Sequence, residues 1–118
     1  MTLSQKQRIF TLNIGKLIAF AYERGLELTF GEAHRTNEQQ LIYVKTGRSQ
    51  TMQSNHLRRL AVDFNVFKNG NLTYEWEDVK PLGDYWESLH PKNRWGGDWN
   101  KNDIKDGFID TPHFEMNA

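Results

Sequence analysis

Apolar residues recur at helical spacing near the start of the chain, at Ile9, Phe10, Ile14, Leu17, Ile18 and Ala21. This pattern predicts an amphipathic helix over residues 3–24, which ends at Gly25 because glycine commonly follows the last helical turn. The next segment, LELTF at 26–30, has the composition of a strand. The chain is therefore expected to begin with a long helix and a strand.

The middle of the chain is more polar. Thr36 followed three residues later by Gln39 has the form of a capping box ahead of apolar residues, which predicts a second helix over 37–46. The polar segment 47–58 predicts a loop that carries His56. These residues are expected to connect the first strand to a second one.

That second strand is AVDFNVF at 61–67, where Val and Phe alternate with other residues. Alternation places Val62, Phe64 and Val66 on one face and Asp63 on the other. The segment KNGN then predicts a hairpin turn into a short strand, LTYEW. Asp63 is thus expected to point away from the apolar side of the sheet.

The last part of the chain predicts a third helix that begins near 75–78 and runs to Leu89, before His90 and a proline. The remainder is rich in Gly, Asp and Trp, which favours loops and two short strands. One of these strands, HFEM at 113–116, could pair beside 61–67. The expected fold is α+β, with N-terminal helices packed on a small antiparallel sheet, in a single domain over residues 1–118.

Composition narrows the possible functions. The chain has no cysteine, which excludes disulfides, thiol nucleophiles and thiolate metal sites. Lys plus Arg and Asp plus Glu each number 15, so no net charge attracts nucleic acid or an anionic membrane. We expect no signal peptide and no membrane insertion, since no apolar segment has the required length or pattern. We also expect a monomer.

Histidine and carboxylate residues supply the candidate chemistry. His56, Asp63 and His113 could form a three-ligand metal site with the fourth position left to water. Asp110, three residues before His113, could take a proton from that water and later give it to a leaving amine. Spacing alone leaves other readings open: single histidines are usually surface or hydrogen-bonded core residues, and an HNH-like nuclease would also use His and Asp with a metal.

A longer pattern is carried by Ser54, His56, Ala61, Asp63, Asp110 and His113. These residues match SxHxxGxAxD followed, much later in the chain, by a carboxylate and a histidine three positions on. In this pattern the chain resembles the zinc D-alanyl-D-alanine peptidase family, which includes VanY-like carboxypeptidases and phage L-alanyl-D-glutamate endopeptidases. The segments GEAHRTNEQQ and WGGDW extend the resemblance over most of residues 28–115, while Arg59 stands where the family has glycine.

The resemblance implies a Hedgehog/D-Ala-D-Ala peptidase-like fold and a set of residue roles. His56, Asp63 and His113 would bind Zn²⁺, and Asp110 would be the general base and then the general acid. Arg35 would hold a substrate carboxylate or the oxyanion, because its planar cation offers several donors. Ser54 would orient the loop before His56 or bind substrate.

The resemblance also implies a function. The form DTPHF is similar to the phage endolysin branch, so we expect a zinc-dependent endolysin that cleaves the L-alanyl-D-glutamate bond of peptidoglycan stem peptides. Such an enzyme would be located in the host cytoplasm before lysis and would act on the periplasmic cell wall during host cell lysis. The alternatives are a D,D-carboxypeptidase of the same family, a non-catalytic module that binds wall peptides, and a metal-dependent nuclease, which the absence of a basic face disfavours.

Residues around the candidate site carry further expectations. Trp95 is expected in the wall of a substrate cleft, and Trp76 and Trp86 in the core. The glycine pair in WGGDW is expected to form a tight turn. Glu115 is expected to alternate away from His113 on the strand, and to be a solvated group or one that supports a ligand, not a metal ligand itself.

Overall fold

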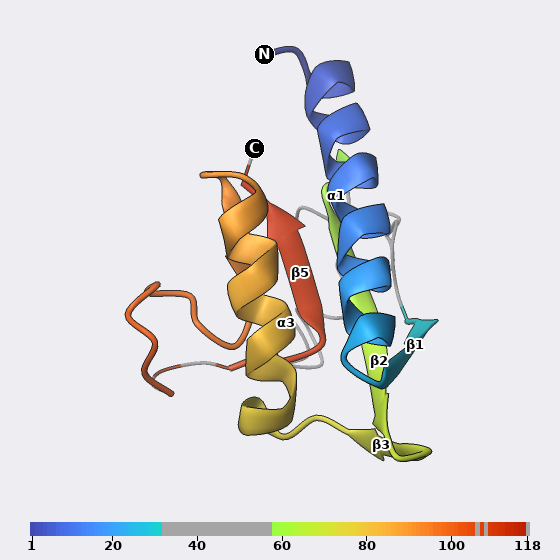
Figure 1. The fold of residues 1–118 in the computed structure, drawn as a ribbon. Helices are drawn as coiled ribbons and strands as arrows, with labels where there is room; N and C mark the ends of the chain where they lie inside the picture. The colour runs from blue at the N-terminus through green and yellow to red at the C-terminus, as the bar shows by residue number, and fades with distance from the viewer. Residues whose placement is uncertain (32–57, 106, 108, 118) are drawn as a thin grey trace, which may run out of the picture.

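The fold is known from a computed structural model, which describes residues 1–31, 58–105, 107 and 109–117. Two helices pack side by side against one face of an antiparallel sheet (Figure 1). The elements are α1 (Leu3–Glu23), β1 (Leu26–Phe30), β2 (Ala61–Lys68), β3 (Asn71–Thr73), α3 (Trp76–Leu89), β4 (Asn93–Trp95) and β5 (His113–Met116). The α+β class predicted from the sequence is confirmed.

Strand β2 is the centre of the sheet. The strand order is β1-β2-β5-β4, and β3 also pairs with β2, all in antiparallel orientation. The C-terminal segment therefore lies beside β2, as the sequence predicts for HFEM. Helix 37–46 and the loop before residue 58 are predictions that lie outside the described residues.

Helix α1 has the ends that its sequence predicts. Thr2 caps the N-terminus, with its hydroxyl accepting from the Gln5 N–H while the Gln5 side chain accepts from the Thr2 N–H. Gly25 follows the helix with a φ of 78°, a left-handed conformation that glycine adopts at little cost. The helix boundary is thus set by local chemistry at both ends.

The strand predicted for LTYEW is wrong after Thr73. Its hydroxyl accepts from the Glu75 N–H and donates to Asp78, so it turns the chain into the first turn of α3. Acidic Glu77 and Asp78 lie in that first turn, where negative charge is favourable. Trp76 accordingly begins a helix instead of ending a strand.

The core lies between the helices and one face of the sheet. The alternate positions predicted as apolar, Val62, Phe64 and Val66, are buried there. They pack with side chains from both helices and β5, which include Leu17, Leu82, Trp86, Phe114 and Met116. The opposite face of β2 carries Asp63 and Asn65 between Ala61 and Phe67.

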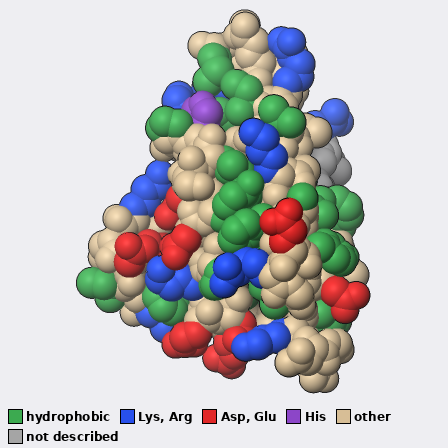
Figure 2. Space-filling view, in the orientation of Figure 1, with side chains coloured by type: hydrophobic (Ala, Val, Ile, Leu, Met, Phe, Trp, Pro, Cys, Tyr) green, Lys and Arg blue, Asp and Glu red, His purple; other side chains and the backbone are tan. Residues whose placement is uncertain are grey.

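The outer surface of the helices carries charges of both signs. Figure 2 shows Lys and Arg side chains interspersed with Asp and Glu over this face of the described residues. Within the described ranges, neither helix has the combination of length and apolar character needed to cross a membrane.

Candidate metal centre

Strand register brings Asp63 and His113 together. They are direct partners in the antiparallel pairing of β2 with β5. Both side chains point to the face that the helices do not cover, because the neighbouring residues Val62, Phe64 and Phe114 are in the core. His113 Nδ1 lies 3.2 Å from Asp63 Oδ1.

Asp110 reaches the same place through a turn before β5. Its N–H donates to the Gly96 carbonyl at 2.8 Å, and its own carbonyl accepts from the His113 N–H at 3.1 Å. Gly96 in turn donates its N–H to the His113 carbonyl. Thr111 anchors the turn by donating its hydroxyl to the Tyr74 carbonyl. The Asp110 side chain is thereby held near the His113 ring.

The glycine pair is required by close packing as well as by the turn. A Cβ on Gly96 would collide with the carbonyl oxygen of Asp110, and a Cβ on Gly97 would collide with the Trp95 ring. Neither glycine has a positive φ, so the requirement is for space. The prediction of a turn at WGGDW is correct, and its role is to let the Asp110 segment approach β4.

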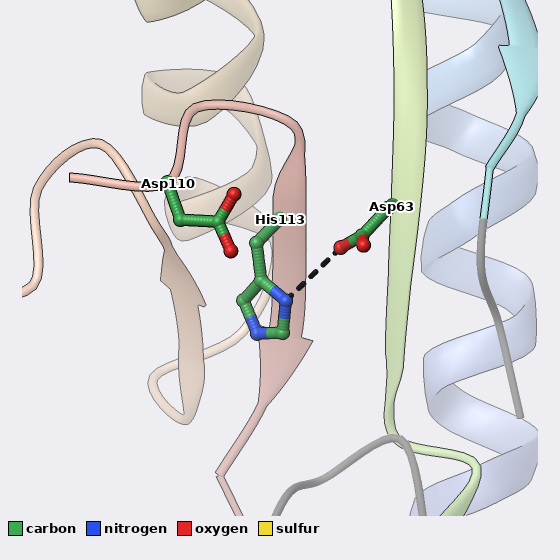
Figure 3. A group of neighbouring side chains, drawn as sticks. All are labelled: Asp63, Asp110 and His113. Carbon is green, nitrogen blue, oxygen red and sulfur yellow. Dashed lines mark hydrogen bonds and ion pairs between the residues drawn. The ribbon is translucent and has the colours of Figure 1, made fainter. Parts of the chain in front are cut away.

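Asp63, Asp110 and His113 converge from β2, the turn and β5 (Figure 3). One ligand atom from each lies within 4.8 Å of the others. Zinc ligands about 2.0–2.1 Å from a tetrahedral ion are about 3.3 Å apart, close to the observed separation of His113 Nδ1 and Asp63 Oδ1. The imidazole nitrogen of His113 and the carboxylate of Asp63 are donors that suit zinc and other divalent ions, and the Asp110 carboxylate lies beside them. The described residues therefore fit a metal.

Glu115 contacts the other ring nitrogen of His113, Nε2. Its Oε1 lies 2.8 Å from Nε2, and its Oε2 accepts from Arg94 Nη2 at 2.7 Å. The expectation that Glu115 faces away from His113 is wrong, because residues two apart on a strand share a face. The same spacing could have identified this contact from the sequence.

The buried ion pairs control the charge of His113. Burial by itself would lower the pKa of its imidazole, but hydrogen bonds with Asp63 and Glu115 outweigh it and raise the pKa to about 9. Burial raises the pKa of Glu115, yet the contacts with His113 and Arg94 lower it below its ordinary value. At neutral pH the raised pKa of His113 and the lowered pKa of Glu115 favour an imidazolium paired with an ionised Glu115.

The role predicted for Trp95 is wrong. This residue is 0% exposed, packs against Trp76 and donates its indole N–H to the Thr111 carbonyl, so it has no surface for a substrate. Trp86 is in the core as predicted, and Trp76 is partly buried at its edge. Trp99, for which the sequence leaves core packing and a cleft wall as alternatives, lies with its ring centroid 5.4 Å from that of His113.

Three residues named from the sequence lie outside the described residues: Arg35, Ser54 and His56. Arg59 is described, and its φ of 57° is the left-handed conformation that glycine adopts readily. The departure from the family glycine is therefore accommodated with the same backbone that a glycine would favour.

Comparisons with known proteins find relatives of this chain. Residues 15–117 match the family model "Phage L-alanyl-D-glutamate peptidase". The chain is 36% identical over 107 residues to the L-alanyl-D-glutamate peptidase of Listeria phage A118, a match that covers 86% of this chain. It spans about a third of that relative's length, 34%.

Two solved structures have a similar fold. The Serratia marcescens L-Ala D-Glu endopeptidase ChiX has a TM-score of 0.60 and 28% identity, over 78% of this chain and 68% of its own. A vancomycin-resistance D,D-pentapeptidase, VanY, solved in complex with Zn(II), has a TM-score of 0.59 and 17% identity, over 92% and 71%. The chain belongs to the phage L-alanyl-D-glutamate peptidase family.

Proposed function

We propose that this protein is a zinc-dependent peptidase that cleaves the bond between L-alanine and D-glutamate in peptidoglycan stem peptides. The observation that carries the proposal is the convergence of Asp63, Asp110 and His113, whose ligand atoms lie within 4.8 Å of one another in a chain of this family. Its place of action would be the bacterial cell wall during phage-induced lysis. Residues 1–118 would act as a single catalytic domain and as a monomer.

The metal would be held by His113 and Asp63, with His56 as the third ligand. His113 offers Nδ1, the nitrogen that faces Asp63, because Nε2 is already engaged by Glu115. When bound, zinc supplies a Lewis acid that polarises a carbonyl and lowers the pKa of water to about 7. The chain's own contribution would be a pair of ligands that face each other on two hydrogen-bonded strands.

Asp110 would be the general base and then the general acid. Its backbone is fixed by Gly96 and His113, which keeps the carboxylate beside the ligands. As a base it would accept a proton from the attacking water, and as an acid it would give that proton to the departing amine. Arg35 and Ser54 would complete the site by binding the substrate.

The experiment is digestion of purified Gram-negative peptidoglycan by zinc-loaded and chelator-treated protein, with mass spectrometry of newly exposed amino termini. The proposal predicts zinc-dependent appearance of free D-glutamyl amino termini. Loss of terminal D-alanine would assign a D,D-carboxypeptidase instead. Binding to peptidoglycan without release of fragments under any metal condition would assign a non-catalytic wall-binding module.

A further inference from the structure

We propose that Glu115, held in turn by Arg94, is a positioning residue that sets which nitrogen of His113 faces the metal. The inference rests on the proposed metal site and adds residues that the motif pattern does not include. Glu115 would act only through His113, since its carboxylate contacts the ring nitrogen remote from Asp63.

The sheet places the three residues in one row. His113 and Glu115 are two apart on β5 and share a face, while Arg94 is the direct partner of Glu115 across the pairing with β4. On the other side, Glu115 is opposite Ala61 of β2, whose small side chain is itself buried. The row from Arg94 to His113 is therefore specified by register.

Because Glu115 is buried, its contacts with His113 and Arg94 have a large effect on its free energy. Glu115 is 5% exposed, and a carboxylate at that depth is costly unless its oxygens are matched by donors. One oxygen faces His113 Nε2 and the other accepts from both Nε and Nη2 of Arg94. Arg94 therefore compensates the buried charge and fixes the direction of the carboxylate.

Aromatic packing restricts the ring from another side. The Trp99 ring lies near His113, with centroids 5.4 Å apart, and the Arg94 guanidinium lies 5.3 Å from the Trp99 centroid. Arg94, Glu115, His113 and Trp99 thus form a closed set of contacts. A flip of the His113 ring would break the contact of Nε2 with Glu115.

The consequence for a metal follows from imidazole chemistry. A neutral imidazole has one N–H and one free lone pair, and an N–H held by a carboxylate leaves the lone pair on the other nitrogen. Such a carboxylate also makes the ligating nitrogen more basic, and its loss typically lowers metal affinity about 10- to 100-fold. Glu115 would therefore favour zinc at Nδ1 and strengthen its binding.

The test measures zinc affinity by competition with a chelator, together with ¹⁵N NMR of the His113 ring in the zinc-loaded protein. Glu115→Ala should weaken zinc binding about 10- to 100-fold and remove the hydrogen-bonded Nε2–H signal. Glu115→Gln has the same size, and its amide oxygen can still accept from Nε2–H, so it should retain part of the affinity. Arg94→Gln should weaken binding less than Glu115→Ala, and Arg94→Lys should restore part of the loss.

Glu87→Gln is the matched control, because Glu87 is a partly buried carboxylate that accepts from the Trp95 N–H on β4. It should leave zinc affinity unchanged. Wild-type zinc affinity in a folded Glu115→Ala variant would overturn the inference. So would wild-type zinc affinity in both single variants, Glu115→Gln and Arg94→Gln. If the wild type releases no D-glutamyl termini while Glu115→Ala still loses zinc affinity, the proposed function fails and the positioning role stands.

Discussion

The two faces of the central strands β2 and β5 are formed by alternating residues of the same segments. One face packs in the core, and the other carries the candidate metal site. On the helix-covered face, Val62, Phe64 and Phe114 are at most 3% exposed and pack in the core. On the other face, Asp63 and His113 meet in an ion pair at 3.2 Å. Residues that stabilise the fold and residues of the candidate metal site are thus adjacent along each strand and point to opposite faces.

This difference shows how one strand pairing serves two purposes. Hydrophobic burial is roughly proportional to area and tolerates small shifts, whereas a metal site needs particular atoms at particular distances. The apolar face supplies the energy that holds β2 against β5, and the register of that pair sets the separation of Asp63 from His113. Substitutions on the two faces should therefore affect different measurements.

The largest effect on function is expected from the polar face. His113→Ala should reduce zinc binding and peptidoglycan cleavage to background. The substitution removes the imidazole ligand, which is the only one in the cluster among the described residues. Thermal unfolding of the chelator-treated variant should remain cooperative, since the apolar face is unchanged. Full zinc occupancy in this variant, measured by elemental analysis, would place the metal elsewhere.

The largest effect on stability is expected from the apolar face. Leu82→Ala, at a position with 0% exposure, should lower the free energy of unfolding by about 2–5 kcal/mol in denaturant titrations. Leu82→Met should cost less than about 1.5 kcal/mol because volume is conserved. Both variants should keep wild-type zinc affinity where they are folded. A loss of zinc affinity as large as that in His113→Ala would contradict the separation of the two faces.

A pH effect should appear in the chelator-treated protein. The pKa of His113 is raised from 6.5 to about 9, so its ion pairs contribute stability that is fully present below pH 6.5 and lost as pH rises through 9. The free energy of unfolding should therefore fall over this range, by a few kcal/mol at most, since one pKa unit is about 1.4 kcal/mol. His113→Gln should lack this slope, and an equal slope in that variant would assign it to other groups.

The smallest effect is expected at a position that belongs to neither face. Arg59→Gly should change the free energy of unfolding by about 0–1 kcal/mol, in the stabilising direction, because relief of the left-handed φ is offset by backbone entropy. Its neighbour is the control: Arg58 has no positive φ, so Arg58→Gly should not stabilise the protein. Equal effects of the two substitutions in thermal unfolding would show that the conformation of Arg59 carries no strain.

Much of this arrangement could be predicted from the sequence because it depends on local patterns. Alternation in AVDFNVF predicts both the burial of Val62 and the outward direction of Asp63. The spacing of Asp110 and His113 predicts their proximity. The pairing of HFEM beside β2 follows from the small number of available strands.

The direction of Glu115 could have been read from alternation, but the other errors come from contacts that alternation and composition do not encode. Trp95 and Trp99 are four residues apart around the same glycines, and only the packing of Trp95 against Trp76 and Gly97 shows which one is buried. The end of β3 depends on hydrogen bonds of the Thr73 side chain, which compete with strand pairing. Arg94 could not be linked to Glu115 without the register of β4.

The most direct measurement is zinc content and release of D-glutamyl amino termini from peptidoglycan for the wild type and Asp110→Asn. We expect Asp110→Asn to keep zinc and to lose cleavage by about 10²- to 10⁴-fold, because the metal ligands remain while the proton acceptor is removed. Wild-type cleavage by Asp110→Asn would contradict its role in proton transfer. Loss of zinc from this variant would make Asp110 a ligand and contradict the assignment of roles within the cluster.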